Sequence, residues 1–378
     1  MSILVLAPTL KTASGHDHAF CTELNRYAGA SNITILASDK FQLEADLPAI
    51  PFFSVDPYEY RWLQREARQP VPLRKFLSSA VQDLRKIDFS IHSKLILHTA
   101  DPIHLVALSR SLPRFKGDIY LGFMLPPSFW LRASIGRLTL SAASDLAIHL
   151  LKRRAAVTLY SETGAIRFDH RSIGCLLKLP PVQSVKIPEA QTNSAPIFDR
   201  NGRIKIGFFG APLDDKGFQI LLQLANDAEI RARFEIRLFL PPDQQELAAK
   251  INHRRDTIIA NSEVRDIPTY FDCLSSVDLV YTLYSPLAYK DRMSGIVQDA
   301  ILAGKPLLVT TGCTDMRRFI DRVAPGAYVH ADYSAAPASE CLASVLESLG
   351  ELSEQARIGA ETIRKMKTFE AFFSTSDA

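Results

Sequence analysis

The chain has 378 residues, 47% of them hydrophobic and 22% charged, with a formal net charge of +3. At roughly 100–200 residues per domain this length predicts two domains, and the mixture of residue types excludes a fibrous or disordered chain. The five cysteines form no Cys-x-x-Cys pair, so we expect no zinc site and no redox motif. We also expect no cofactor. No apolar run reaches the roughly 18 residues of a membrane-spanning helix and no leader is recognisable, so we expect a cytoplasmic protein.

The charges are distributed unevenly along the chain. Residues 1–190 contain 23 Lys and Arg against 16 Asp and Glu, whereas the remainder contains 21 against 25. This asymmetry is either random surface variation or the mark of a face that meets an anionic partner. Because no cluster combines strong basic charge with aromatic residues, we expect no nucleic-acid partner.

In the first half of the chain, short apolar runs alternate with helical segments. The apolar runs are continuous, which is typical of strands buried on both faces of a parallel sheet. We predict strands at residues 3–7, 33–37, 95–97, 119–123 and 157–160, and helices at residues 19–27 and 103–112. This alternation predicts a parallel, doubly wound sheet.

The alternation restarts after a stretch rich in Pro, Gln, Ser and Asn. We predict strands at residues 204–209, 234–239, 257–260, 279–283 and 307–310, and helices at residues 218–225, 244–253, 270–276 and 295–303. The chain is therefore predicted to be an α/β protein of two Rossmann-like, doubly wound domains that face each other across a cleft. The predicted domains are residues 1–185 and 203–360, joined by a linker at 186–202 and followed by a helical tail at 361–378 that packs back on the first domain.

The first candidate site is the loop after the first predicted strand. Gly15 precedes a helix N-terminus, where backbone amides can approach an anion and the helix dipole favours negative charge. His16 titrates near neutral pH and is a candidate general base. The alternative is that His16 or Asp17 only caps the helix.

The second candidate site follows the predicted strand at residues 204–209. Gly210 ends this strand, and Lys216 lies in the loop that enters the next helix. A lysine at that place can neutralise a diphosphate as a point charge. Lysines before helices are common on protein surfaces, so this pattern alone does not identify a site.

The third candidate site runs from Asp291 to Asp299. Ser294 is placed to cap the helix that begins at Gly295, and this glycine allows a ligand to approach the helix start. Asp299 lies one turn into the helix, where it can accept hydrogen bonds from sugar hydroxyls, and Asp291 can meet another sugar from the preceding loop. The alternative is that both aspartates only favour the helix N-terminus electrostatically.

Residues 270–310 resemble the donor-binding segment of the retaining group 1 glycosyltransferases, which have the GT-B fold. In that family two glutamates with seven residues between them precede an Ala and a Gly-x-Pro before a strand. Asp291 and Asp299 have the same separation here, and Ala300 and the Gly-Lys-Pro at 304–306 follow them. The resemblance implies that Asp291 lies near the donor sugar and that Asp299 binds the ribose, although both carboxylates are one methylene shorter than in the family.

The resemblance extends to the loop after Gly210, where Lys216 and Gly217 match the family's donor-phosphate loop. The arginine of that loop falls on Ala211, and Arg292 is a candidate substitute for it. The resemblance thus implies that the diphosphate of a donor binds here.

The sequence also differs from the family at a histidine position. A histidine of many family members falls on Ala100, and His98 and His104 lie near it as alternative candidates or as structural residues. Gly15-His16 resembles instead the Gly-His of inverting GT-B enzymes, in which the histidine activates the acceptor. We expect retention of configuration, because the match from Asp291 to Asp299 is longer and more specific.

The resemblance implies a glycosyltransferase that moves a hexose from a UDP- or GDP-sugar to a glycan or lipid-linked acceptor, in cell-surface polysaccharide or lipopolysaccharide synthesis and without a metal. The N-terminal domain would bind the acceptor and the C-terminal domain the donor. Two alternatives stay open: a catalytically weak binding or scaffold subunit, and a nucleotide-sugar epimerase of the same fold. The predicted donor site comprises Gly15, Gly210, Lys216, Arg292, Ser294, Gly295 and Asp299, with Asp291 and His16 as the catalytic candidates.

The basic N-terminal domain also has features of a membrane-binding surface. Residues 152–154 are Lys-Arg-Arg after an apolar helix, and Trp130 and Phe129 are candidate interfacial anchors. Enzymes with lipid-linked acceptors use such surfaces on anionic membranes, so we expect peripheral association with the inner face of the membrane. The alternative is a solvated helix face.

Overall fold

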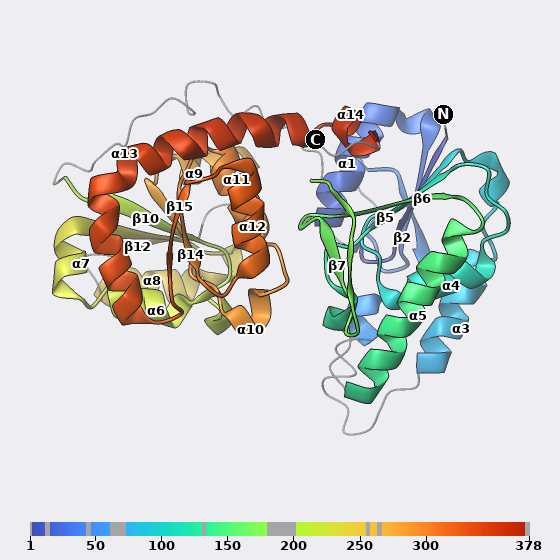
Figure 1. Ribbon diagram of the computed structural model, residues 1–378, viewed down its shortest axis with the longest axis horizontal. Helices are drawn as coiled ribbons and strands as arrows, with labels where there is room; N and C mark the ends of the chain where they lie inside the picture. Colours follow the sequence, from blue (N-terminus) through green and yellow to red (C-terminus); the bar gives the residue numbers. More distant parts are fainter. Residues whose placement is uncertain are drawn as a thin grey trace. The chain divides into compact units, whose positions relative to one another are not determined.

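A computed structural model describes residues 2–11, 16–42, 47–60, 73–130, 134–179, 202–254, 258–262 and 267–374. The chain forms two compact units (Figure 1): unit 1 comprises Met1–Gln183 and Met366–Ala378, and unit 2 comprises Ser184–Lys365. The last segment of the chain thus belongs to unit 1. The predicted linker at 186–202 lies outside the described residues except for its final position.

Unit 1 is built on seven parallel strands in the order β3-β2-β1-β4-β5-β6-β9. The strands are β1 (Ile3–Ala7), β2 (Ile33–Ser38), β3 (Ala49–Phe53), β4 (Lys94–Leu97), β5 (Asp118–Gly122), β6 (Ala156–Ser161) and β9 (Leu176–Leu177). All five strands predicted for this half are present, and their parallel pairing confirms the doubly wound sheet. The sequence does not predict the edge strand β3, because Pro51 within it argues against a strand.

Helices cover both faces of this sheet. They are α1 (His16–Ala28), α3 (Leu73–Leu84), α4 (Pro102–Ser111), α5 (Ser134–Lys152) and α14 (Phe369–Phe373). Along β1, Ile3 and Val5 pack with α1 and α14, whereas Leu4 and Leu6 pack with α3, α4 and α5. Successive side chains of a strand point to opposite faces, which is why a strand buried on both sides needs a continuous apolar run.

The short helix α14 fixes the end of the chain on unit 1. Phe372 packs against Phe20 and Tyr160, with ring centroids 5.3 and 5.0 Å apart. Lys178 donates a hydrogen bond from its Nζ to the carbonyl oxygen of Ser374 at 2.6 Å. A cation at this end of a helix is electrostatically favourable, because the last carbonyl groups carry negative partial charge.

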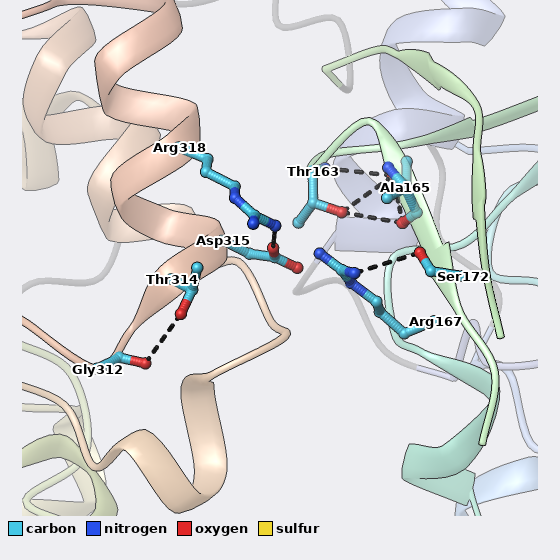
Figure 2. Close-up of polar contacts among 9 residues, drawn as sticks. Thr163, Ala165, Arg167, Ser172, Gly312, Thr314, Asp315 and Arg318 are labelled. Carbon is cyan, nitrogen blue, oxygen red and sulfur yellow. Dashed lines mark hydrogen bonds and ion pairs between the residues drawn. The ribbon is translucent and has the colours of Figure 1, made fainter. Parts of the chain in front are cut away.

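An antiparallel hairpin follows β6 and extends unit 1 beyond the sheet. Its strands are β7 (Ala165–Arg167) and β8 (Ser172–Gly174). Figure 2 shows two of its polar contacts: Arg167 donates to the Oγ of Ser172 at 3.2 Å, and Thr163 donates to the carbonyl oxygen of Ala165 at 3.0 Å. These bonds close the hairpin across its strands and at its start.

Unit 2 is built on six parallel strands in the order β12-β11-β10-β13-β14-β15. They are β10 (Ile204–Phe209), β11 (Phe234–Phe239), β12 (Ile258–Asn261), β13 (Leu279–Thr282), β14 (Leu307–Thr310) and β15 (Tyr328–Ala331). The five strands predicted for this half are present and parallel, which confirms the second doubly wound sheet. The sequence does not predict the edge strand β15, in which His330 is exposed.

The helices of unit 2 also lie on both faces of its sheet. They are α6 (Phe218–Leu224), α7 (Ala228–Arg233), α8 (Gln245–Arg254), α9 (Ile267–Ser275), α10 (Pro286–Tyr289), α11 (Gly295–Leu302), α12 (Thr314–Val323) and α13 (Ala335–Met366). Ile206 and Phe208 of β10 share a core with α6, α7, α8 and the first half of α13. The second half of α13 meets the end of α12, since a Cβ on Gly359 would lie 2.3 Å from that of Ala324.

The strand order reverses beside one central strand in each sheet. In unit 2, β11 and β12 lie on one side of β10, and β13, β14 and β15 lie on the other. In unit 1 the corresponding strand is β1, between β2 and β4. Ligands of open parallel sheets bind outside the carboxyl ends of the strands at such a reversal. The loops after β10 and β13, and those after β1 and β4, are therefore the expected positions of functional groups.

Candidate functional site

The loop after β10 depends on two glycines. Gly210 ends the strand with a φ of 103°, and Gly217 begins α6 with a φ of 69°, both of which favour glycine. A short 3-10 turn, Asp214–Lys216, lies between them. A Cβ on Gly217 would lie 2.1 Å from the carbonyl oxygen of Leu283, just beyond β13. The absence of a side chain at Gly217 therefore allows the loops after β10 and β13 to pack directly together.

Lys216 carries the positive charge of this loop. Its Nζ lies over Gly210, where an added Cβ would approach it to 2.9 Å. The side chain is half-buried and forms no salt bridge among the residues that the structure describes. Burial lowers the pKa of the Lys216 ammonium, the negative charge of Asp215 opposes this, and the positive charge of Arg292 lowers the pKa as well. A half-buried cation that no salt bridge neutralises favours an anionic ligand.

The loop after β13 brings a second cation to the same strand ends. The guanidinium of Arg292 lies 4.8 Å from the ring centroid of Tyr289, which packs on Tyr284 at 4.6 Å. The charge of Arg292 lowers the pKa of Lys216, so it acts on this lysine from the loop after β13. The structure thus brings together the lysine predicted for the phosphate loop and the arginine that was the candidate to replace the one missing there.

The start of α11 differs from the expected cap. Ser294 occupies the N-cap position, but its side chain makes no capping hydrogen bond. Its hydroxyl instead bonds the hydroxyl of Tyr284. Burial raises the pKa of Tyr284, and the hydrogen bond from Ser294 lowers it. Ser294 is therefore the N-cap residue that the sequence predicts, but its hydroxyl makes no hydrogen bond to the backbone of the helix. The backbone amides at Gly295 begin the helix without a cap from that hydroxyl.

Asp299 lies one turn into α11 and is half-buried. The hydroxyl of Tyr270, on α9, donates a hydrogen bond to its Oδ2 at 3.0 Å. Burial, followed by the charge of Asp299, raises the pKa of Tyr270, so this tyrosine stays protonated and remains a donor. Tyr270 also packs edge-on against Phe209, which stacks on Phe239 at 4.6 Å. The carboxylate is thereby oriented beside the end of β10.

Sequence analysis does not identify Tyr270, because it lies in a different helix, 29 residues before its partner Asp299. Its position at the start of the segment that resembles the glycosyltransferase family is the nearest indication in the sequence. Asp291 is exposed in the turn between α10 and α11. The carboxyl ends of β10 and β13 therefore gather Lys216, Arg292 and Asp299, with Asp291 in the same loop as Arg292.

In unit 1, Gly15 lies outside the described residues and His16 is the first residue of α1. Asp17, which follows it, is held between two loops. Thr9 donates a hydrogen bond to its Oδ2 at 2.6 Å, and Thr99 donates to its Oδ1 at 2.8 Å. These threonines follow β1 and β4, the strands at the reversal of unit 1. Asp17 thus ties the start of α1 to both loops.

His98 and His104, the alternative histidines, are core residues of unit 1. His98 is fully buried, stacks on Phe20 with ring centroids 3.9 Å apart, and has its Nδ1 3.0 Å from the hydroxyl of Tyr160. His104 is 2% exposed, and its Nδ1 lies 2.8 Å from Oδ2 of Asp101. Both side chains are therefore structural, and neither is accessible for catalysis within unit 1.

The proposed membrane-binding surface is smaller than expected. Trp130 is 2% exposed and packs among aromatic neighbours, so its prediction as an interfacial anchor is wrong. Arg154 donates hydrogen bonds to carbonyl oxygens at the end of α4, at 2.6 and 2.9 Å, which leaves Lys152 and Arg153 exposed. Across the described ranges, none of the helices has the length and apolar character needed to cross a membrane.

Comparison with known proteins finds similarity in structure but not in sequence. The sequence matches no protein-family model and no curated protein. Sucrose-phosphate synthase from Thermosynechococcus elongatus is 11% identical, with a TM-score of 0.56 over 98% of this chain and 96% of that chain. HepE of Anabaena, solved in complex with UDP, is 14% identical, with a TM-score of 0.55 over 97% and 95%. The spinosyn rhamnosyltransferase SpnG is 16% identical, with a TM-score of 0.55 over 97% of both chains.

These likenesses extend over both units and nearly the full length of each compared chain. The chain therefore has the GT-B fold that its sequence predicts, with one parallel, doubly wound sheet in each of its two Rossmann-like domains. At these levels of identity the likeness establishes the fold, and the reaction has to be argued from the site.

Proposed function

We propose that the chain is a glycosyltransferase that binds a nucleotide sugar through unit 2. The observation that carries this proposal is the half-buried ammonium of Lys216, which forms no salt bridge in the described part of the chain and lies at the end of the central strand. Together with Arg292, whose charge acts on it from the loop after β13, this ammonium matches the charge of a diphosphate. The fold supports this donor class, since HepE is known with UDP and glucose, and SpnG with thymidine diphosphate.

In this proposal the donor diphosphate is the leaving group. Lys216 and Arg292 bind it and stabilise the negative charge that it gains as the bond to the sugar breaks. The amides at Gly295 add the favourable potential of a helix N-terminus. Asp299 accepts hydrogen bonds from the ribose hydroxyls, and Asp291 contacts the donor sugar.

We expect a UDP- or GDP-hexose as donor and retention of the anomeric configuration. The separation of Asp291 and Asp299, which matches that of the retaining enzymes, supports this stereochemistry. In a retaining reaction the donor's own phosphate accepts the proton of the acceptor hydroxyl. His16 then shapes its loop, whereas in an inverting reaction it would be the general base, a role worth about 10²–10⁴-fold in rate.

Unit 1 is the proposed site of the acceptor, a glycan or lipid-linked saccharide of cell-surface polysaccharide or lipopolysaccharide synthesis. The basic excess of residues 1–190 supports an anionic acceptor or an anionic membrane surface next to it. Lys152 and Arg153 are the exposed part of this charge at the end of α5. Attraction of this kind is weakened by salt, since it acts between solvent-exposed charges.

A panel of UDP-, GDP- and ADP-sugars tests the proposal. Incubation with the full chain should release a nucleoside diphosphate from one donor, and NMR of the glycosylated product should show the retained anomer. Tight binding of a donor without release of its diphosphate would support a scaffold subunit. Conversion of one nucleotide sugar into its epimer would support the epimerase alternative.

A further inference from the structure

The turn that carries Lys216 is held by other parts of unit 2. The amide of Ser285, after β13, donates a hydrogen bond to the carbonyl oxygen of Asp215 at 2.8 Å. The hydroxyl of Tyr281, within β13, donates to the carbonyl oxygen of Gly217 at 2.8 Å. The residues before and after Lys216 are therefore both bonded to the neighbouring strand or the loop that follows it.

Tyr333 adds a contact from the edge of the sheet. It follows β15, and its hydroxyl donates a hydrogen bond to the carbonyl oxygen of Asp214. The pKa of this hydroxyl is raised by burial and by the charges of Asp214 and Asp215, while the amide of Gly217 acts in the opposite direction. A raised pKa keeps the hydroxyl protonated and able to donate. The Tyr333 hydroxyl thus contacts the turn at Asp214.

The consequence of this arrangement is that the backbone beneath Lys216 is fixed. A lysine side chain is a flexible stem, so its ammonium has a defined position only where the backbone and the surrounding atoms restrict it. Here Nζ lies over Gly210 at the end of β10. A charge that is already in position binds an anion more tightly than one that must first be ordered. We therefore expect the affinity for an anion to depend on the contacts at Asp214, Asp215 and Gly217, although these contacts do not involve the anion.

We propose that Tyr333 is a positioning residue for Lys216, whose hydroxyl sets the affinity of unit 2 for the diphosphate group and not for the nucleoside. This inference rests on the proposed function of unit 2 as the nucleotide-sugar site. Tyr333 acts only through the hydrogen bond to the Asp214 carbonyl, so its effect is confined to the part of the ligand that Lys216 binds.

Tyr333→Phe tests this inference, because it removes the hydroxyl and keeps the ring. Calorimetry on the full chain measures Kd for UDP, GDP, uridine, guanosine and inorganic pyrophosphate. The variant should raise Kd for the preferred nucleoside diphosphate and for pyrophosphate about 2- to 12-fold, the range expected for one neutral hydrogen bond, and leave Kd for the nucleoside unchanged. Tyr328→Phe is the matched control, since that hydroxyl donates to exposed Asp321 on the same unit and should change none of these values.

Tyr281→Phe, which removes the bond to the Gly217 carbonyl, should give the same selective loss. Unchanged diphosphate and pyrophosphate affinity in Tyr333→Phe, or an equal loss for the nucleoside, overturns the positioning role. If the wild type binds pyrophosphate but no nucleoside diphosphate, the proposed function fails, and the pyrophosphate measurement still decides the role of Tyr333. If the wild type binds none of these probes, both are wrong.

Discussion

The two units share one architecture but use charge differently at the reversal of strand order. In unit 1 the carboxylate of Asp17 receives hydrogen bonds from Thr9 and Thr99, one from each loop. In unit 2 the ammonium of Lys216 has no salt bridge in the part of the chain that the structure describes. A charge whose hydrogen bonds are made within the fold stabilises the loops, whereas a cation that no salt bridge neutralises can act on a ligand. This difference supports the proposal that unit 2 binds the nucleotide.

The same contrast appears in the aromatic residues. In unit 1, Phe372 of α14 fills the space between Phe20, Tyr120 and Tyr160. In unit 2, the hydroxyl of Tyr270 orients a carboxylate of the candidate site. The aromatic cluster of unit 1 therefore contributes to the core, whereas the tyrosine of unit 2 orients a carboxylate of the candidate site.

The largest expected effect is on the stability of unit 1. Phe372→Ala removes a ring that is 1% exposed, and such truncations lower the free energy of unfolding by about 3–5 kcal/mol. The unfolding transition of unit 1 should therefore shift strongly to lower temperature, while nucleoside diphosphate binding below that transition is unchanged. Ile91→Ala, at a position that is 66% exposed, is the control and should leave both properties as they are. If the folded Phe372→Ala variant bound the nucleotide more weakly than the wild type, nucleotide binding would not be confined to unit 2.

The next effect concerns the cation of unit 2. Lys216→Ala removes a charged hydrogen-bond donor, which is worth about 1.5–3 kcal/mol, or about 10- to 150-fold in Kd for a nucleoside diphosphate. Lys250→Ala, at an exposed position on α8, is the control and should bind as the wild type does. Calorimetry measures both. Equal affinities for the wild type and Lys216→Ala would show that this charge is not the anion site.

The two aspartates should separate binding from turnover. Asp299→Ala removes the hydrogen-bond acceptor proposed for the ribose. This variant should raise the nucleotide Kd by up to about 150-fold, the upper value expected for Lys216→Ala. Tyr270→Phe keeps the Asp299 carboxylate but removes the hydrogen bond that orients it. This variant should raise the nucleotide Kd about 2- to 12-fold. Asp291→Ala should lower turnover and leave the nucleotide Kd unchanged. Titration and steady-state kinetics on the three variants check this, and wild-type affinity in Asp299→Ala contradicts the ribose assignment.

The smallest effect is a pH dependence at alkaline pH. Burial, with a contribution from Arg292, lowers the pKa of Lys216 below the usual 10.5, against the charge of Asp215. A lysine with a lowered folded-state pKa loses its proton earlier, so diphosphate affinity is full at neutral pH and falls as the pH rises towards 10.5. Stability changes in the opposite direction, because the unfolded chain holds this proton longer and the folded state gains as the pH rises. In Lys216→Arg, whose guanidinium does not titrate in this range, the part of the decline due to residue 216 should disappear.

The sequence predicts the sheets of both units because their central strands are buried on both faces and read as continuous apolar runs, as in Ile3–Ala7 and Ile204–Phe209. It misses β3 and β15, since an edge strand such as Ala49–Phe53 is exposed on one side and contains a proline. Local spacing also predicts that Lys216 lies in the loop after β10 and that Asp299 lies one turn into α11. These parts of the account depend on residues that are close in the sequence.

Contacts between distant residues cannot be read from local patterns. Tyr270 reaches Asp299 from another helix, and Tyr333 reaches Asp214 across 119 residues. The side chain of Ser294 bonds Tyr284 and makes no capping hydrogen bond to its own helix. Each of these depends on which strands are neighbours in the sheet, and that order is a property of the whole unit.

Hydrogen–deuterium exchange of the full chain, with and without a saturating nucleoside diphosphate, tests the central claim most directly. If unit 2 holds the nucleotide, protection should appear in the peptides that contain Gly210–Gly217 and the start of α11. The loops around Thr9 and Thr99 in unit 1 should exchange as they do without the ligand. Protection confined to those unit 1 loops, with no change around Lys216, would contradict the account.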